Sequence, residues 1–170
     1  MEAHKIINLE ETQESVGQAG KYLTFALGQE EYGIGILKIR EIIGMMPITA
    51  VPQTPAFIKG VINLRGKVIP VTDLRMKFGL EITDYTERTC IIVVEIENGS
   101  RLLTMGLVVD GVSEVANIKG GEIEGAPDFG DGRHTGFIKG MAKIAGGVKI
   151  LLDIDCILTG EQLAGLEELH

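Results

Sequence analysis

Residues 57–74 read Phe-Ile-Lys-Gly-Val-Ile-Asn-Leu-Arg-Gly-Lys-Val-Ile-Pro-Val-Thr-Asp-Leu, and a related stretch follows 80 residues later, at 137–154. Without a gap, seven of the eighteen aligned positions are identical, where average residue usage would give about one. The identical pairs are Phe57/Phe137, Ile58/Ile138, Lys59/Lys139, Gly60/Gly140, Gly66/Gly146, Val68/Val148 and Asp73/Asp153. The chain therefore repeats one small β unit. This repeat predicts two similar halves with several binding faces, and not a fold built around a single catalytic cleft.

Local patterns around the repeat also favour short strands and tight turns. Residues 21–27 alternate, with every second side chain apolar, which is strand periodicity. Arg65-Gly66 separates two apolar runs and predicts a hairpin with positive φ at Gly66, and Asn98-Gly99 predicts another hairpin. A fainter repeat with an offset of 73 matches Gly33, Ile34, Ile39, Glu41 and Ile42 to Gly106, Leu107, Val112, Glu114 and Val115.

The sequence predicts helical structure in three segments, and it predicts no regular structure at the N-terminal end. Isoleucines at helical spacing predict a short helix over residues 36–43, and residues 73–79 predict a helical turn that ends at glycine. Residues 159–170 predict a C-terminal helix, which packs on the body of the protein or docks a partner. Residues 1–20 are polar and predict a loosely held tail. The sum is a mainly β chain with short helices, which favours barrels.

Composition excludes several classes of function. The 170 residues carry a net charge of −8, which argues against binding to nucleic acid or to an anionic membrane. No apolar run reaches the roughly 18 residues needed to span a bilayer and no signal segment opens the chain, so a cytoplasmic protein is expected. Cys90 and Cys156 lie in apolar surroundings without a Cys-x-x-Cys motif, which predicts reduced core thiols.

Residues that could support catalysis or bind a cofactor do not occur at the spacings that such sites require. The three histidines are dispersed, so no metal site is expected, and the Gly60–Lys67 stretch lacks the spacing and the hydroxyl of a phosphate loop. No cofactor is predicted. Asp73, Asp110 and Asp153 could form an acid pair in a small hydrolase. Since Asp73 and Asp153 occupy matching places in the two repeats, turn hydrogen bonds explain them more simply.

The two repeats differ at the tip of the predicted hairpin. Arg65 in the first copy aligns with Ala145 in the second. From the residues alone, an arginine at an exposed tip is more simply explained as a solvated charge. The functional alternative is a contact with a protein partner. Ile39 and Val115 are open to two interpretations as well. Either they belong to the core, or they line an apolar groove between the halves.

Three stretches resemble the CheW family of bacterial chemotaxis coupling proteins: residues 31–42, residues 54–74 with their Pro-x-Phe-x-x-Gly-Val-x-Asn-Leu-Arg-Gly run, and residues 106–115. The resemblance covers about 21–157. It implies two SH3-like five-stranded β-barrels with strand exchange, forming one domain over 21–158 that divides softly into 21–88 and 89–158. It also implies a non-enzymatic adaptor between the cytoplasmic tips of chemoreceptors and the regulatory domain of the histidine kinase CheA.

The resemblance also assigns site residues in this chain. The positions implied to contact the receptor are Ile39, Glu41, Gly60, Arg65 and Val115, and those implied to contact the kinase are Ile36, Ile39 and Phe129. Phe129 matches the aromatic residue that relatives use at the second interface of the kinase–adaptor ring. A basic position of the family near it falls on Glu124, a charge reversal that puts that contact in doubt. Two alternatives share the fold, namely the regulatory domain of the kinase itself and one half of a fusion with a receiver domain. The length of the chain argues against both.

Overall fold

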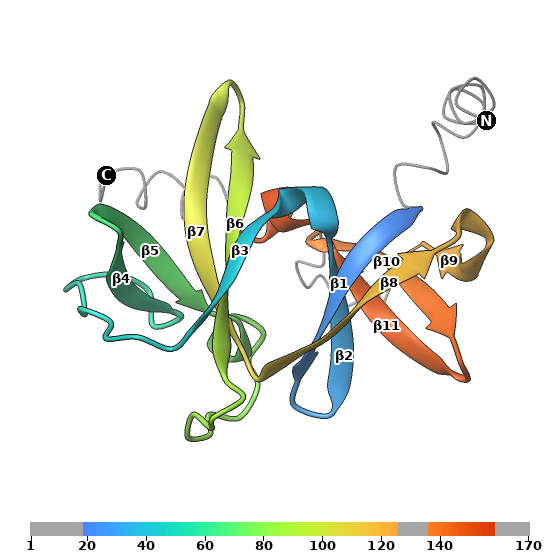
Figure 1. The fold of residues 1–170 in the computed structure, drawn as a ribbon, viewed down its shortest axis with the longest axis horizontal. Coiled ribbons are helices and arrows are strands. Elements are labelled where there is room, and N and C mark those ends of the chain that lie inside the picture. The colour runs from blue at the N-terminus through green and yellow to red at the C-terminus, as the bar shows by residue number, and fades with distance from the viewer. Residues whose placement is uncertain (1–18, 126–135, 159–170) are drawn as a thin grey trace.

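The computed structural model describes residues 19–125 and 136–158, and within them the chain forms two β-sheets that lie side by side along the long axis of the molecule (Figure 1). The predicted tail, except for its last two residues, and the predicted helix at 159–170 lie outside the described residues. The mainly β fold class is confirmed. None of the helices in the described ranges has the length and apolar character to cross a membrane.

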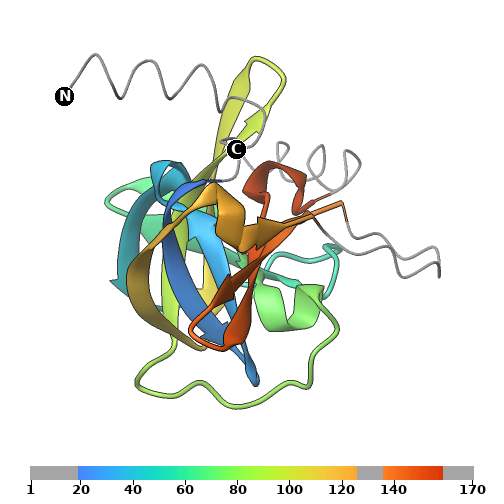
Figure 2. The ribbon, with the colours of Figure 1, turned by 90° about the vertical axis from the view of Figure 1, so that its right-hand side faces the viewer.

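The first sheet is built from one continuous stretch of chain. Its strand order is β3-β6-β7-β5-β4. Its strands are β3 (Ile39–Gly44), β4 (Ile58–Leu64), β5 (Lys67–Asp73), β6 (Cys90–Asn98) and β7 (Arg101–Val109), with the short helix α3 (Leu74–Lys77) after β5. The β6–β7 hairpin projects from the body in both views (Figures 1 and 2).

The second sheet combines the first hairpin of the chain with its last strands, in the order β8-β1-β2-β11-β10-β9. Its members are β1 (Gly20–Leu27), β2 (Glu30–Gly35), β8 (Gly111–Ile118), β9 (Ile123–Glu124), β10 (Ile138–Ile144) and β11 (Gly147–Leu152). Three 3₁₀ turns join the elements, namely η1 (Ile36–Lys38), η2 (Gly120–Glu122) and η3 (Ile154–Cys156). The sheets thus do not divide the chain near residue 88, because the first hairpin pairs with strands that follow residue 110.

The sequence repeat corresponds to a repeat of strand pairing. The parallel pair β5–β7 sets Val71 opposite Gly106, and the parallel pair β11–β2 sets Leu151 opposite Gly33. A bulge breaks the register at Ile58/Gly60 in β4, and the same bulge recurs at Ile138/Gly140 in β10. Strands β3, β4, β5, β6 and β7 of the first sheet therefore match β8, β10, β11, β1 and β2 of the second.

The buried apolar side chains of the described residues form three clusters, of which one joins the two sheets. The largest contains buried side chains from both sheets, including Phe25 and Ile34 from one and Val94 and Met105 from the other. A second cluster lies within the first sheet and a third within the second sheet. Because the largest cluster spans both sheets, the two halves share one core and form a single packed body.

The helix predicted over residues 36–43 is wrong, because only η1 is helical and Ile39 begins strand β3. The β-branched side chains of this segment pack well on a pleated surface. A bulge between Ile39 and Glu41 interrupts the pairing of β3 with β6. Ile39 and Ile43 lie four positions apart, so simple strand alternation puts both on the half-buried face, while Ile42 is exposed. The spacing of these isoleucines therefore fits a strand as well as a helix.

The prediction of core thiols holds only in part. Both cysteines are free, and Cys90 is half-buried against the central cluster. Cys156, in η3, is exposed, although Ile154 and Ile157 lie close to it in the sequence. Burial raises the pKa of both thiols, and the carboxylate of Asp153 raises that of Cys156 further. Neither thiol is therefore activated as a nucleophile.

Candidate functional site

The tip of the β4–β5 hairpin is a two-residue turn in which both residues have positive φ, 52° at Arg65 and 87° at Gly66. The side-chain oxygen of Asn63 accepts a hydrogen bond from the Gly66 amide at 2.8 Å and closes the turn. The matching tip has nearly the same values, 51° at Ala145 and 79° at Gly146. The arginine is therefore not required by the turn, since alanine adopts the same backbone.

Arg65 instead makes an ion pair with Glu41 of β3, 24 residues earlier in the chain. The Arg65 side chain is 70% exposed and that of Glu41 is 31% exposed. The pair joins the hairpin tip to β3, at the opposite edge of the same sheet. An exposed pair of this kind contributes little to stability, roughly 0–1 kcal/mol. It leaves the outer face of the guanidinium open to a partner.

The two isoleucines assigned to the kinase contact point mainly inward. Ile36 and Ile39 are half-buried and pack against the central cluster. Leu37, which lies between them in η1, is 96% exposed. The sequence interpretation missed Leu37, because the wrong helical spacing made the isoleucines the apolar face. Lys38 anchors this turn through an ion pair with Asp155 of 2.7 Å.

Gly60 is buried and has no side chain to offer to a partner. Its φ is +143°, and a Cβ atom there would lie 2.0 Å from the carbonyl oxygen of Thr49. The bridge between Thr49 and Val61 brings these backbones together. The local contribution of Gly60 is thus to allow the close approach of the Thr49–Ala50 backbone to β4.

The remaining predicted site residues lie apart from the Arg65 hairpin or outside the described residues. Val115 is in β8 of the other sheet and is 52% exposed, so it is not a core residue. Phe129 lies outside the described residues. Glu124 of β9, which the resemblance matched to a basic position, pairs with Lys143 at 2.7 Å. Ile42, the match of Val115 in the first sheet, is 46% exposed and was missed by the sequence interpretation.

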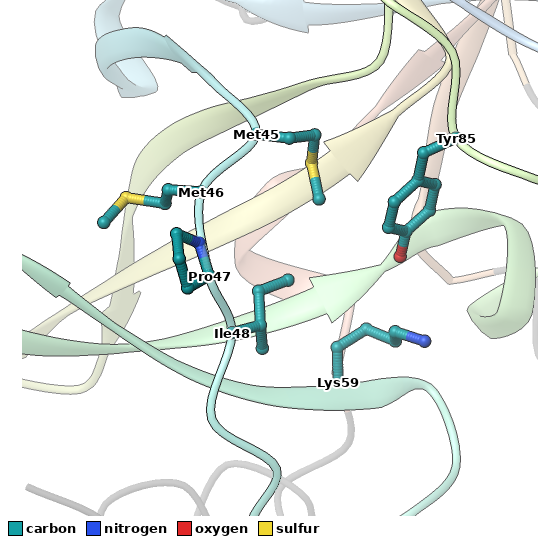
Figure 3. Close-up of a pocket in the computed structure, with 6 residues that line it drawn as sticks. All are labelled: Met45, Met46, Pro47, Ile48, Lys59 and Tyr85. Carbon is teal, nitrogen blue, oxygen red and sulfur yellow. The ribbon is translucent and has the colours of Figure 1, made fainter.

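A hollow of about 490 Å³ opens on the first sheet (Figure 3). Its lining comes from the β3–β4 connection, from β4 and from the segment before β6, and comprises Met45, Met46, Pro47, Ile48, Lys59 and Tyr85. The Lys59 ammonium lies 5.9 Å from the centre of the Tyr85 ring. The Tyr85 hydroxyl donates a hydrogen bond to Asp73 at 3.1 Å, and burial raises its pKa to about 12. The tyrosine therefore stays protonated, and the hollow offers apolar contact instead of acid–base chemistry.

Each of the three carboxylates considered for hydrolysis is held by structural contacts. Asp73 caps α3 by accepting hydrogen bonds from the amides of Arg75 and Met76. Asp153 accepts one from the Asp155 amide at the start of η3. Asp110 accepts two from the Arg75 guanidinium, at 2.8 and 2.7 Å. Within the described ranges, His, Cys, Asp and Glu side chains do not gather in threes to hold a metal ion.

Comparisons with known proteins agree with this architecture. The family model described as the CheW-like domain matches residues 21–162. The chemotaxis protein CheW of Klebsiella aerogenes is 43% identical over 151 residues, covering 89% of this chain and 87% of that protein. CheW of Rhizobium meliloti is 34% identical, covering 82% and 88%. The crystal structure of the scaffolding protein TtCheW from Thermoanaerobacter tengcongensis superposes with a TM-score of 0.74 at 35% identity, covering 85% of this chain and 96% of that one. The chain therefore belongs to the CheW family.

Proposed function

We propose that this protein is a non-enzymatic adaptor that couples the cytoplasmic tips of chemoreceptors to the histidine kinase CheA. It works in the cytoplasm, at the inner face of receptor arrays. Family membership supports an adaptor, since the solved relative is titled a scaffolding protein. The observation on this chain that carries the proposal is the exposed Arg65–Glu41 pair, because only one of two otherwise matching hairpins bears it.

Such an adaptor needs surfaces and no reaction chemistry. The surface around Arg65 would receive the receptor tip and fix its orientation through charge. The exposed Leu37 and the half-buried Ile36 and Ile39 next to it would supply apolar contact to the kinase regulatory domain. Phe129 stays a proposed kinase contact from the family resemblance alone. Because both partners are held by one packed body, a shift of the receptor would bias the kinase between active and inactive states.

Replacing Arg65 with alanine is expected to weaken binding of a chemoreceptor tip fragment by about tenfold, which corresponds to about 1.4 kcal/mol. The guanidinium would be lost, but the hairpin would keep its shape, since Ala145 has the same backbone angle. Unfolding stability should change by less than about 1 kcal/mol. Calorimetric titration with the receptor fragment, and separately with the kinase regulatory domain, measures the two contacts.

The matched control is Lys143→Ala, which removes the cation of the exposed Lys143–Glu124 pair in the second sheet. It should leave receptor binding unchanged. Equal affinity of Arg65→Ala and wild-type protein for the receptor fragment would count against the proposed receptor face. A wild-type protein that binds neither fragment would overturn the proposed function itself.

A further inference from the structure

The first part of the β3–β4 connection, residues 45–54, has few hydrogen bonds to the sheet on which it lies. Two of its residues are prolines, which have no amide hydrogen to donate. Among the described residues, one bridge supplies its backbone hydrogen bonds to the sheet. The Thr49 amide donates to the Val61 carbonyl oxygen at 2.9 Å, and the Val61 amide donates to the Thr49 carbonyl oxygen at 2.8 Å. Side-chain packing must therefore supply the rest of the attachment.

Two consecutive methionines provide much of that packing. Met45, Met46 and Ile48 pack against the apolar cluster of the first sheet. Both methionines are half-buried and line the open hollow. Figure 3 shows them extending to opposite sides of the connection, with Met45 on the side of Tyr85. Their thioethers thus lie where solutes can reach them, while the same side chains hold the connection on the sheet.

The other methionines in the described part of the chain lack this combination. Met105 is fully buried in the central cluster. Met76 and Met141 are half-buried, but they pack against none of the three apolar clusters. Of the methionines that the structure describes, Met45 and Met46 alone are both accessible and in contact with a core cluster.

A thioether in this position is a substrate for a hydroperoxide. One peroxide oxygen forms an S–O bond with the methionine sulfur, the O–O bond breaks, and the peroxide is reduced to water or an alcohol as the sulfur loses two electrons. The product, methionine sulfoxide, is polar and disrupts apolar packing. The buried side chains of the cluster are isoleucines and valines, which have no donor for the sulfoxide oxygen. The oxidised side chains would therefore leave the cluster for water.

We propose that Met45 and Met46 form an oxidation site, at which a peroxide releases residues 45–54 from the first sheet and a methionine sulfoxide reductase restores them. The site lies between β3, which carries Glu41, and β4, which leads to Arg65. Release would loosen the placement of these two strands and weaken the surface formed by the ion pair. This effect on receptor binding rests on the proposed function, but the release itself does not.

Hydrogen exchange measured by mass spectrometry tests the release directly. After peroxide treatment, the Thr49 and Val61 amides are expected to exchange about tenfold faster, because their bridge opens without global unfolding. The amides that pair β6 with β7 should keep their rates. Treatment with methionine sulfoxide reductases should restore slow exchange, since sulfoxide formation is reversible by these enzymes.

Two double variants show which methionines are responsible. Met45→Leu/Met46→Leu keeps the side chains apolar and similar in volume, so the variant should fold and should exchange slowly even after peroxide treatment. Met76→Leu/Met141→Leu is the matched control and should respond to peroxide as the wild type does. Both variants keep the two cysteines, so a loosening caused by thiol oxidation would persist in the first variant. Circular dichroism checks that each variant is folded.

Three results would overturn the inference. In the first, wild-type protein with sulfoxide at Met45 and Met46 exchanges as slowly as the reduced protein. In the second, Met45→Leu/Met46→Leu loosens as much as the wild type. In the third, peroxide oxidises Met76 and Met141 but spares Met45 and Met46. If the release occurs but the unoxidised wild type binds neither the receptor fragment nor the kinase regulatory domain, the inference stands and the proposed function fails.

Discussion

Gly60→Ala is expected to lower the free energy of unfolding by about 3 kcal/mol, because among the described glycines its added Cβ would make the shortest contact. The added Cβ would lie 2.0 Å from the Thr49 carbonyl oxygen and 2.9 Å from the Cα of Ala50, so backbone atoms of β4 or of the β3–β4 connection must move. The φ of +143° adds a conformational cost for any side chain. Urea denaturation of wild type and variant measures the difference.

Substitutions at two other glycines measure the cost of positive φ and the cost of the steric clash separately. At Gly66, φ is +87° but a Cβ would meet nothing within 4 Å, so Gly66→Ala should cost only the backbone term, about 1–2 kcal/mol. Gly140→Ala tests the clash alone, because its Cβ would lie 2.8 Å from the Glu124 carbonyl oxygen without a positive φ. A Gly60→Ala protein as stable as Gly66→Ala would contradict the expected clash. Loss of receptor binding in a Gly60 variant should therefore be attributed first to the fold.

Asp110→Ala is expected to cost about 2–3 kcal/mol, less than a fully buried ion pair would lose. Asp110 joins β7 of the first sheet to β8 of the second. One of its carboxylate oxygens binds Arg75, and the other binds both Arg75 and the Gly28 amide, the latter at 2.7 Å. Removing the carboxylate leaves the Arg75 side chain, only 17% exposed, without its ion-pair partner and with only its hydrogen bond to the Glu81 carbonyl oxygen, at 2.7 Å. The loss can be measured by urea denaturation, with the exposed Asp84→Ala as control.

The same carboxylate should make stability depend on pH. Burial alone would raise the pKa of Asp110, but the hydrogen bonds from Arg75 and Gly28 outweigh it and leave the pKa below its usual value. A lowered folded-state pKa gives stabilisation that is complete above the unfolded value, about 3.9, and is lost as the pH falls through the folded value. Between about pH 7 and pH 3, Asp110→Asn should lose less stability than the wild type. Parallel curves for the two proteins would contradict this expectation.

The strands and turns that local chemistry determines were predictable. Alternation indicated β1, glycine and asparagine indicated the hairpin turns, and the repeat indicated matching strands. Residues 36–43 were mispredicted because their isoleucines fit two periods. The decision between those periods comes from pairing with β6, about 50 residues later in the chain. Exposure at Leu37 and Cys156 depends on packing that the sequence pattern does not contain.

The sequence predicted the individual residues of the candidate site, but it did not predict that Arg65 and Glu41 form an ion pair. Comparing the two repeats singled out Arg65 against Ala145, and the fainter repeat matched Glu41 with Glu114. That Arg65 and Glu41 meet follows only when β3 and the β4–β5 hairpin come together in three dimensions. The apolar hollow at Met45 and Tyr85 gave no sequence signal, because its walls come from loops whose mutual placement is set by the sheets.

The placement of the β1–β2 hairpin has a consequence for synthesis on the ribosome. Residues 39–109 contain every strand of the first sheet, so that sheet can form while the chain is still growing. The hairpin at residues 20–35 emerges earlier, but its neighbours β8 and β11 begin only at residues 111 and 147. At roughly 5–20 residues per second, it waits on the order of 4–20 s for them. The β1–β2 hairpin, translated before every other strand in the described residues, is thus among the last to reach its native partners, with long-range contacts that slow folding.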